Sequence, residues 1–188
     1  MSNYTVFAGV NGAGKSTLYS TYKDLHDEKR VNCDEIVTEL GGDWRNNEDQ
    51  FRAGKVAIKR IENYLSNGIS FNQETTLASK VTIRYAERAK ELGYTTELHF
   101  VYVESADVSI DRVNIRVRNG GHGIPEDVIR RRYLKSIANL KEAIKMFDIV
   151  YVYDNTYQFK VLASYYHGEM AQRIDYIPKW FEDFINNQ

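Results

Sequence analysis

The chain has 188 residues, of which 43% are hydrophobic and 27% are charged, values that are ordinary for a globular protein with a sizeable core. Its formal net charge of −1 argues against broad electrostatic attachment to nucleic acid or to an acidic membrane surface. The single cysteine, Cys33, excludes an internal disulfide and fits a reducing compartment.

The N-terminus leads directly into an apolar run at residues 4–8, which we predict to be the first strand. This arrangement leaves no room for a signal peptide. No apolar run approaches the ~20 residues that a membrane-spanning helix needs. We therefore expect a cytoplasmic protein that has neither nucleic acid nor a membrane as its partner.

The most informative stretch follows this strand. Residues 9–17 have the G-x-x-x-x-G-K-S spacing of a phosphate-binding loop and precede a helix predicted at residues 16–22. Glycines let backbone amides approach phosphate oxygens, Lys15 would reach the β- and γ-phosphates, and the Ser16 hydroxyl would ligate Mg²⁺. The alternative is a glycine-rich turn with a solvated lysine. We expect ATP and Mg²⁺ as ligands, with these nucleotide-binding residues: Gly9, Asn11, Gly12, Ala13, Gly14, Lys15, Ser16 and Thr17.

The next segment carries a candidate catalytic carboxylate. Residues 23–30 form a charged stretch typical of a loop or a frayed helix end, and residues 31–32 are too short to predict a strand. A helix begins at residues 33–35 and ends near residues 41–42. Within its first turn, Asp34 is either a base that accepts a proton from a substrate hydroxyl or a helix N-cap. Cys33 is expected to pack as a small apolar side chain.

An amphipathic helix is predicted at residues 47–66, with an apolar face formed by Phe51, Ile58, Ile61 and Leu65. Asn67 and Gly68 would end it.

A strand at residues 69–74 ends in Glu74, which is followed closely by Thr76. Glu74 is a candidate to hold substrate or the outer shell of Mg²⁺. Its alternative role is a strand-end carboxylate bonded to backbone amides.

The second half of the chain continues the alternation of strands and helices. The further predicted elements are a helix at 79–92, a strand at 98–103, helices beginning at 105 and 125, a strand at 149–153, a hairpin at 159–166 and 170–174, and a helix at 178–185. This order predicts an α/β fold with a parallel central sheet and helices on both faces, as in the three-layer, kinase-like P-loop NTPases. We expect one domain over residues 1–188, with Asp34, Glu74, Thr76 and Asp154-Asn155 collected at the carboxyl ends of the strands.

Two of these helices are rich in arginine and flank a glycine-rich break at residues 119–123. The arginines are Arg112, Arg116, Arg118, Arg130, Arg131 and Arg132. They suit a helical lid at about residues 105–135 that closes over phosphates and excludes water. The alternative is a pair of solvated helices. His122 lies between the glycines of the break, and we expect it to be exposed.

Four segments together resemble the zeta-toxin family of P-loop kinases, in its compact branch often labelled predicted ATPase. These segments are residues 4–17, 32–35, 74–77 and 112–140, and the most diagnostic part is residues 116–125. The resemblance implies a kinase that phosphorylates the 3′-hydroxyl of UDP-N-acetylglucosamine. It also implies a toxin that a protein antitoxin holds in check.

Carried over by position, the resemblance places Lys15 and Ser16 in the nucleotide site and makes Asp34 the catalytic base. Glu74 and Thr76 match the acid and the hydroxyl that bind substrate, and Arg118 and Arg131 match the arginines that contact phosphate. Two alternatives remain at this point. In the first, the protein is a kinase whose acceptor is another nucleotide, a dinucleotide cofactor or a simple sugar. In the second, it is a non-catalytic module that binds a partner in response to ATP.

Overall fold

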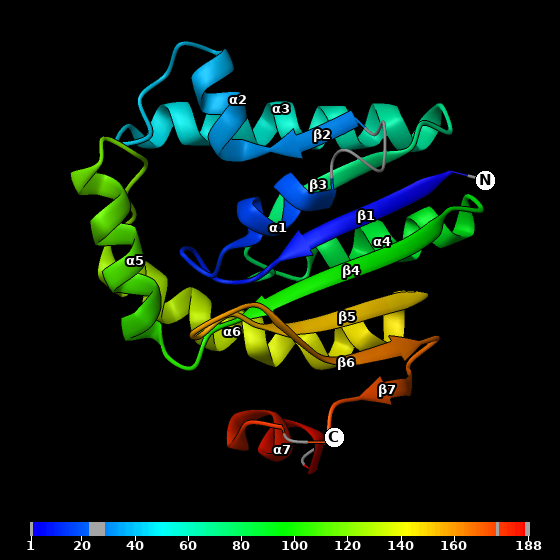
Figure 1. The fold of residues 1–188 in the computed structure, drawn as a ribbon. Coiled ribbons are helices and arrows are strands. Elements are labelled where there is room, and N and C mark those ends of the chain that lie inside the picture. The colour runs from blue at the N-terminus through cyan, green and yellow to red at the C-terminus, as the bar shows by residue number, and fades with distance from the viewer. Residues whose placement is uncertain (1, 23–28, 176, 187–188) are drawn as a thin grey trace.

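A computed structural model describes residues 2–22, 29–175 and 177–186. It contains a seven-stranded sheet in the order β2-β3-β1-β4-β5-β6-β7, with helices on both sides (Figure 1). Strands β2, β3, β1, β4 and β5 run parallel, and β6 and β7 add an antiparallel edge. The strands are β1 (Asn3–Ala8), β2 (Lys29–Asn32), β3 (Phe71–Thr75), β4 (Thr95–Tyr102), β5 (Ile149–Asp154), β6 (Lys160–Tyr166) and β7 (Glu169–Arg173).

The helices are α1 (Lys15–Tyr22), α2 (Cys33–Glu39), α3 (Asn47–Ser66), α4 (Val81–Glu91), α5 (Ala106–Arg118), α6 (Glu126–Met146) and α7 (Lys179–Asn186). The predicted parallel sheet with helices on both faces is confirmed, and so are the terminal hairpin and the closing helix. In the part of the chain that the structure describes, no helix is long and apolar enough to cross a bilayer.

Strand β1 lies in the middle of the sheet, paired with β3 on one side and β4 on the other. Tyr4 and Phe7 are fully buried on its opposite faces. Tyr4 stacks on Phe71 with ring centroids 4.5 Å apart, whereas Phe7 packs edge-on against Tyr19 of α1. Because β1 is fixed on both faces and both edges, the loop that follows it starts from a rigid point.

Strand β2 was not predicted from the sequence, because residues 31–32 were too short to indicate a strand. It pairs in parallel with β3, from Lys29 opposite Phe71 to Asn32 opposite Glu74. Residues 23–28 of the predicted loop lie outside the described residues. The consequence of this added strand is that its carboxyl end lies beside that of β3.

The bounds of α3 agree with the prediction, but its buried face does not. Phe51 and Ile58 are 67% and 50% exposed, while Ala53 and Ala57 are buried in the same row as Ile61 and Leu65. Helix α3 packs against α2 and β2, and small alanine side chains allow these backbones to approach closely. The spacing of apolar residues therefore predicted the wrong buried face for the first half of α3.

Helices α5 and α6 are separated by the glycine-rich break, as predicted. Ser105 accepts a hydrogen bond from the Val108 amide and caps α5, and Asn119 follows its last turn. Gly120 adopts a φ of +82°, a left-handed conformation that disfavours residues with a Cβ atom. Pro125 then precedes the first turn of α6. The break therefore ends one helix and redirects the chain into the next.

Candidate active site

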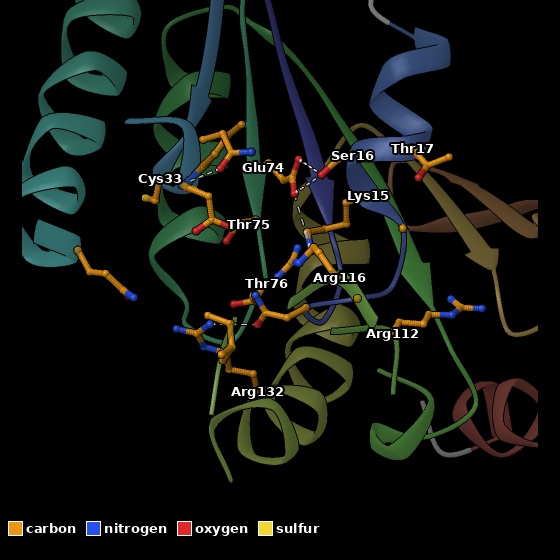
Figure 2. Close-up of a pocket in the computed structure, with 18 residues that line it drawn as sticks. Lys15, Ser16, Thr17, Cys33, Glu74, Thr75, Thr76, Arg112, Arg116 and Arg132 are labelled. Atoms are coloured by element: carbon orange, nitrogen blue, oxygen red, sulfur yellow. Dashed lines mark hydrogen bonds and ion pairs between the residues drawn. The ribbon is translucent and has the colours of Figure 1, made fainter. Parts of the chain in front are cut away.

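A pocket of about 520 Å³ lies at the carboxyl ends of the parallel strands, and Figure 2 shows the side chains around it. It is lined by the phosphate loop, the start of α2, the end of β3, and arginines from α5 and α6. Figure 2 places Thr17 and Arg112 on one side and Cys33 and Thr75 on the other, which we call the Cys33 side. Lys15, Glu74 and Arg116 lie between them.

The phosphate loop has the backbone that its glycines predict. Gly9, Gly12 and Gly14 have φ values of 139°, 82° and 102°. A Cβ atom on Gly9 would lie 2.2 Å from the carbonyl oxygen of Val101, and one on Gly12 would lie 2.6 Å from that of Ser109. The loop is therefore pressed against β4 and α5. Of the predicted nucleotide-binding residues, Gly9 and Ala13 are not among the residues that line the pocket, and the other six line it.

Lys15 is buried in this loop, with 7% of its side chain exposed. Its Nζ donates to the Val10 carbonyl oxygen at 3.1 Å and lies 3.9 Å from Glu74 Oε1. Burial lowers the pKa of Lys15, and the carboxylates of Glu74 and Asp34 oppose that shift. The loop thus holds an oriented amino group where a phosphate chain would lie.

Glu74 is held by side chains, so its alternative role as a carboxylate bonded to backbone amides is wrong. The Ser16 hydroxyl donates to both carboxylate oxygens at 3.1 Å, and Arg30 Nη2 donates to Oε2 at 2.6 Å. Sequence reasoning missed Arg30, since it lies in the charged stretch that resembled a loop. It also donates from Nη1 to Asn72 Oδ1 at 3.1 Å, and its guanidinium lies 3.6 Å from the Tyr19 ring centroid.

Asp34 lines the pocket with 48% of its side chain exposed. It is not the helix cap. Asn32 is the N-cap of α2, and its side chain accepts a hydrogen bond from the Asp34 amide at 2.9 Å. The Asp34 carboxylate is therefore not used in capping. The neighbouring Cys33 is exposed at the pocket, which corrects the prediction that it packs as an apolar side chain.

Thr76 also lines the pocket. The residues expected to bind substrate, Asp34, Glu74 and Thr76, thus share one cavity with Lys15.

The structure does not bring the two arginines chosen from the sequence to the pocket. Arg118 and Arg131 are exposed and are not among its lining residues. Arg112, Arg116 and Arg132 line it instead.

Each of the three pocket arginines has a defined anchor. Arg112 Nη2 donates to the carbonyl oxygens of Asn155 and Thr156, both at 2.8 Å. Arg116 Nε donates to the His122 carbonyl oxygen at 2.7 Å. Arg132 Nη1 donates to Asn11 Oδ1 at 3.0 Å.

A guanidinium nitrogen of Arg116 is buried in the pocket. Within the described residues, Arg116 Nη2 is buried and makes no hydrogen bond. Buried polar groups in proteins are normally paired, so this N–H group is available to an oxygen that enters the pocket. The pocket therefore fits an anionic ligand that bears oxygens beside the phosphate loop.

The end of β5 contacts the phosphate loop from the other side. Asn155 Nδ2 donates to the Ala13 carbonyl oxygen at 2.8 Å, and a Cβ atom on Gly14 would lie 2.4 Å from the same nitrogen. Of the predicted polar pair at residues 154–155, Asn155 therefore supports the loop, whereas Asp154 accepts from Thr156, and neither is among the residues that line the pocket.

Comparison with known proteins agrees with this geometry. Residues 5–142 match the AAA domain family. The chain belongs to this family. An uncharacterised protein from Haemophilus influenzae is 31% identical over 134 residues, which cover 71% of this chain and 94% of the relative.

Solved structures extend the likeness of the AAA domain to kinase-like P-loop folds. One comes from the PezAT chromosomal toxin–antitoxin system of Streptococcus pneumoniae, with a TM-score of 0.64 and 16% identity over 100% of this chain and 84% of that chain. The AvrRxo1-ORF1:-ORF2 complex with ATP gives a TM-score of 0.75 and 18% identity over 98% of this chain and 63% of that chain. The resemblance to zeta-toxin P-loop kinases is confirmed as a likeness of fold.

Proposed function

We propose that this protein is an ATP-dependent kinase that transfers the γ-phosphoryl group to a hydroxyl of a small molecule. The observation that carries the proposal is the pocket itself, which combines the phosphate-loop lysine, two carboxylates and arginines from two separate helices. A module that only binds ATP needs the lysine and the loop. It does not need a carboxylate that has no capping role, and Asp34 is such a carboxylate.

The residues present fit ATP and Mg²⁺. The loop amides and Lys15 would hold the phosphates, with the rest of the nucleotide towards Thr17 and Arg112. Mg²⁺ prefers oxygen ligands, and the Ser16 hydroxyl beside the Glu74 carboxylate offers them. When bound, the metal supplies positive charge that neutralises the phosphate oxygens.

The proposed chemistry is a direct transfer. The acceptor hydroxyl oxygen forms a bond to the γ-phosphorus, the bond from that phosphorus to the β-bridging oxygen breaks, and ADP leaves. Asp34 accepts the hydroxyl proton. Lys15, Arg116 and Arg132 stabilise the negative charge on the transferred group.

We further propose that residues 105–135 act as the lid of this kinase. Arg116 and Arg132 come from its two helices and reach the same pocket, so closing the lid would assemble the phosphate-binding cations together. It would also exclude water that competes with the acceptor hydroxyl.

The first acceptor to test is the 3′-hydroxyl of UDP-N-acetylglucosamine. Support comes from the zeta-toxin-like segments at residues 32–35 and 74–77, whose members Asp34, Glu74 and Thr76 share the pocket. The fold likeness to a structure of a toxin–antitoxin system supports a protein antitoxin as a partner. Other nucleotides, dinucleotide cofactors and simple sugars are the competing acceptors.

The test is transfer of labelled phosphate from ATP to a panel of these acceptors. The proposal expects a phosphorylated product and an ATP turnover that rises when the correct acceptor is added. Tight ATP binding with no product from any acceptor would instead assign the chain to the non-catalytic binding modules.

A further inference from the structure

We propose that His122 is a positioning residue for Asp34, and that its contact with Trp44 holds the glycine-rich loop over the Cys33 side of the pocket. This inference rests on the proposed kinase function. Sequence reasoning placed His122 in an exposed hinge, but the structure shows its side chain only 17% exposed.

The contact with Trp44 joins two distant segments of the chain. Residues 119–125, between α5 and α6, reach the connection between α2 and α3 (Figure 1). There the ring centroids of His122 and Trp44 lie 5.1 Å apart. A Cβ atom on Gly123 would lie 2.5 Å from Cη2 of Trp44, so the loop sits directly against the indole. The glycine is needed here for close approach.

The position of His122 is fixed from its backbone as well. Arg116 Nε donates to the His122 carbonyl oxygen at 2.7 Å. A Cβ atom on Gly121 would lie 2.7 Å from Arg116 Cγ, which shows how tightly the loop packs on this side chain. Arg116 therefore lines the pocket and also fixes the position of the glycine-rich loop.

From this position the imidazole faces the candidate base. His122 Nε2 lies 3.7 Å from Asp34 Oδ1, slightly beyond hydrogen-bond distance. Among the described residues, Nε2 is buried without a hydrogen-bond partner. Asp34 is the half-exposed partner, and a small rotation of its side chain would close the gap.

The role follows from the two carboxylate oxygens of Asp34. When Nε2–H donates to Oδ1, the carboxylate is held in one orientation and Oδ2 remains free for the acceptor hydroxyl. His122 then acts through Asp34 and touches no reacting atom. The charged groups around the imidazole are Asp34, Arg116, Asp43 and Arg45.

The neutral form of His122 suits this donor role. Burial lowers the pKa of His122, Asp34 and Asp43 raise it, and Arg116 and Arg45 lower it further, with a net decrease from the ordinary value of 6.5. The imidazole is therefore mostly neutral at neutral pH.

The contact can be tested without substrate. The chain has two tryptophans, Trp44 and Trp180, and Trp180 stacks on Tyr102. The variant Trp180→Phe keeps an aromatic ring at that position and leaves Trp44 as the fluorescent indole. A protonated imidazole in contact with Trp44 quenches its emission. We expect a quenching step with a midpoint below pH 6.5. Asp34→Asn should lower that midpoint, because a carboxylate charge that raises the pKa of His122 is removed.

Two controls make the titration decisive. His122→Phe keeps a ring against Trp44 and should abolish the step, whereas His167→Phe, at the β6–β7 turn, should leave it unchanged. A step that persists in His122→Phe, or a midpoint that does not move in Asp34→Asn, overturns the contact.

The positioning role is tested by transfer of labelled phosphate from ATP to UDP-N-acetylglucosamine and the competing acceptors. His122→Phe should lower kcat ~10- to 100-fold through misplacement of Asp34, with the KM for ATP changed by less than about two-fold. His122→Gln, which restores an N–H donor, should recover most of the rate. A wild-type rate in His122→Phe, or a glutamine variant no faster than the phenylalanine variant, overturns the role.

The two proposals fail in distinguishable ways. If the wild-type protein transfers phosphate to no acceptor, the kinase function and the positioning role both fall, while the Trp44 titration still decides whether His122 and Asp34 interact. If transfer occurs but the His122 variants behave as wild type, only the positioning role is lost.

Discussion

Lys15 is the side chain on which nucleotide binding most depends, because its amino group is buried in a loop with no second lysine. Lys15→Ala should weaken ATP binding ~10- to 100-fold, the loss typical of hydrogen bonds to charged groups. Calorimetric titration with ATP measures this effect. Lys59→Ala, on the exposed side of α3, is the matched control and should bind as wild type. Wild-type affinity in Lys15→Ala would remove the loop from the nucleotide site.

For Asp34, the role of general base and the role of helix cap can now be tested separately. Asn32 caps α2, so Asp34→Asn should leave folding and ATP binding nearly intact. An amide cannot accept a proton at neutral pH, and loss of a general base lowers transfer by ~10²–10⁴-fold. Phosphate-transfer rates with the acceptor found in the panel check this prediction.

A matched variant tests the capping assignment. Asn32→Ala removes the side chain that accepts from the Asp34 amide and should lower the free energy of unfolding by ~1 kcal/mol. Near-normal transfer by Asp34→Asn would contradict the base assignment, whatever the stability of the capping variant.

At the scale of elements, α5 and α6 present only one face each to the pocket. Arg116→Ala and Arg132→Ala should lower turnover ~10²-fold, with a smaller effect on ATP affinity, because these cations act mainly on charge in the transition state. Arg118→Ala and Arg131→Ala, on exposed positions of the same helices, are the matched controls. Equal turnover in all four variants would show that these helices do not act on the phosphates.

The choice between these arginines could not be made from the sequence. Arg112 and Arg116 are four residues apart and share a helix face, whereas Arg118 points elsewhere. On α6, Arg132 follows the buried Ile129 by three residues and turns inward with it. The sequence shows which arginines share a face, but the inward direction depends on where each helix packs.

The same limit explains the elements that were predicted less well. The bounds of α3 were predictable from Asn67-Gly68 and its periodicity, but its alanine-lined packing face required the positions of α2 and β2. Strand β2 is short, and its place at the sheet edge comes from pairing with β3. The phosphate loop was predictable because its function depends on local glycine geometry.

At the scale of the whole molecule, Asp148 joins elements across the sheet. Its carboxylate accepts hydrogen bonds from the Thr96 amide and hydroxyl at 2.9 and 2.8 Å, and Lys90 Nζ lies 3.0 Å away. Burial raises the pKa of Asp148, but the bonds from Thr96 and Lys90 outweigh burial and hold it below 3.8. The ionised form therefore favours the folded state.

This arrangement predicts how stability depends on pH. Because the pKa of Asp148 is lower in the folded state, its stabilisation is present above the ordinary value of 3.8 and is lost as the pH falls below 3.8 and through the folded value. Asp148→Asn should lower the free energy of unfolding at neutral pH by ~1–3 kcal/mol and flatten its decline in acid. Urea unfolding at several pH values measures both; identical acid slopes in the two proteins would contradict the assignment.

The central position of β1 also determines when the nucleotide site can form during synthesis. Tyr4 pairs with Phe71 on one side and Thr96 on the other, and Gly9 rests on the carbonyl oxygen of Val101. Strand β1 precedes β3 and β4 in the chain, so its pairing is completed only after β4 has been synthesised. Until then β1 is an apolar strand without its partner strands, the kind of segment that chaperones protect. A fragment that ends before β4 would contain the whole phosphate-loop sequence and still lack its shape.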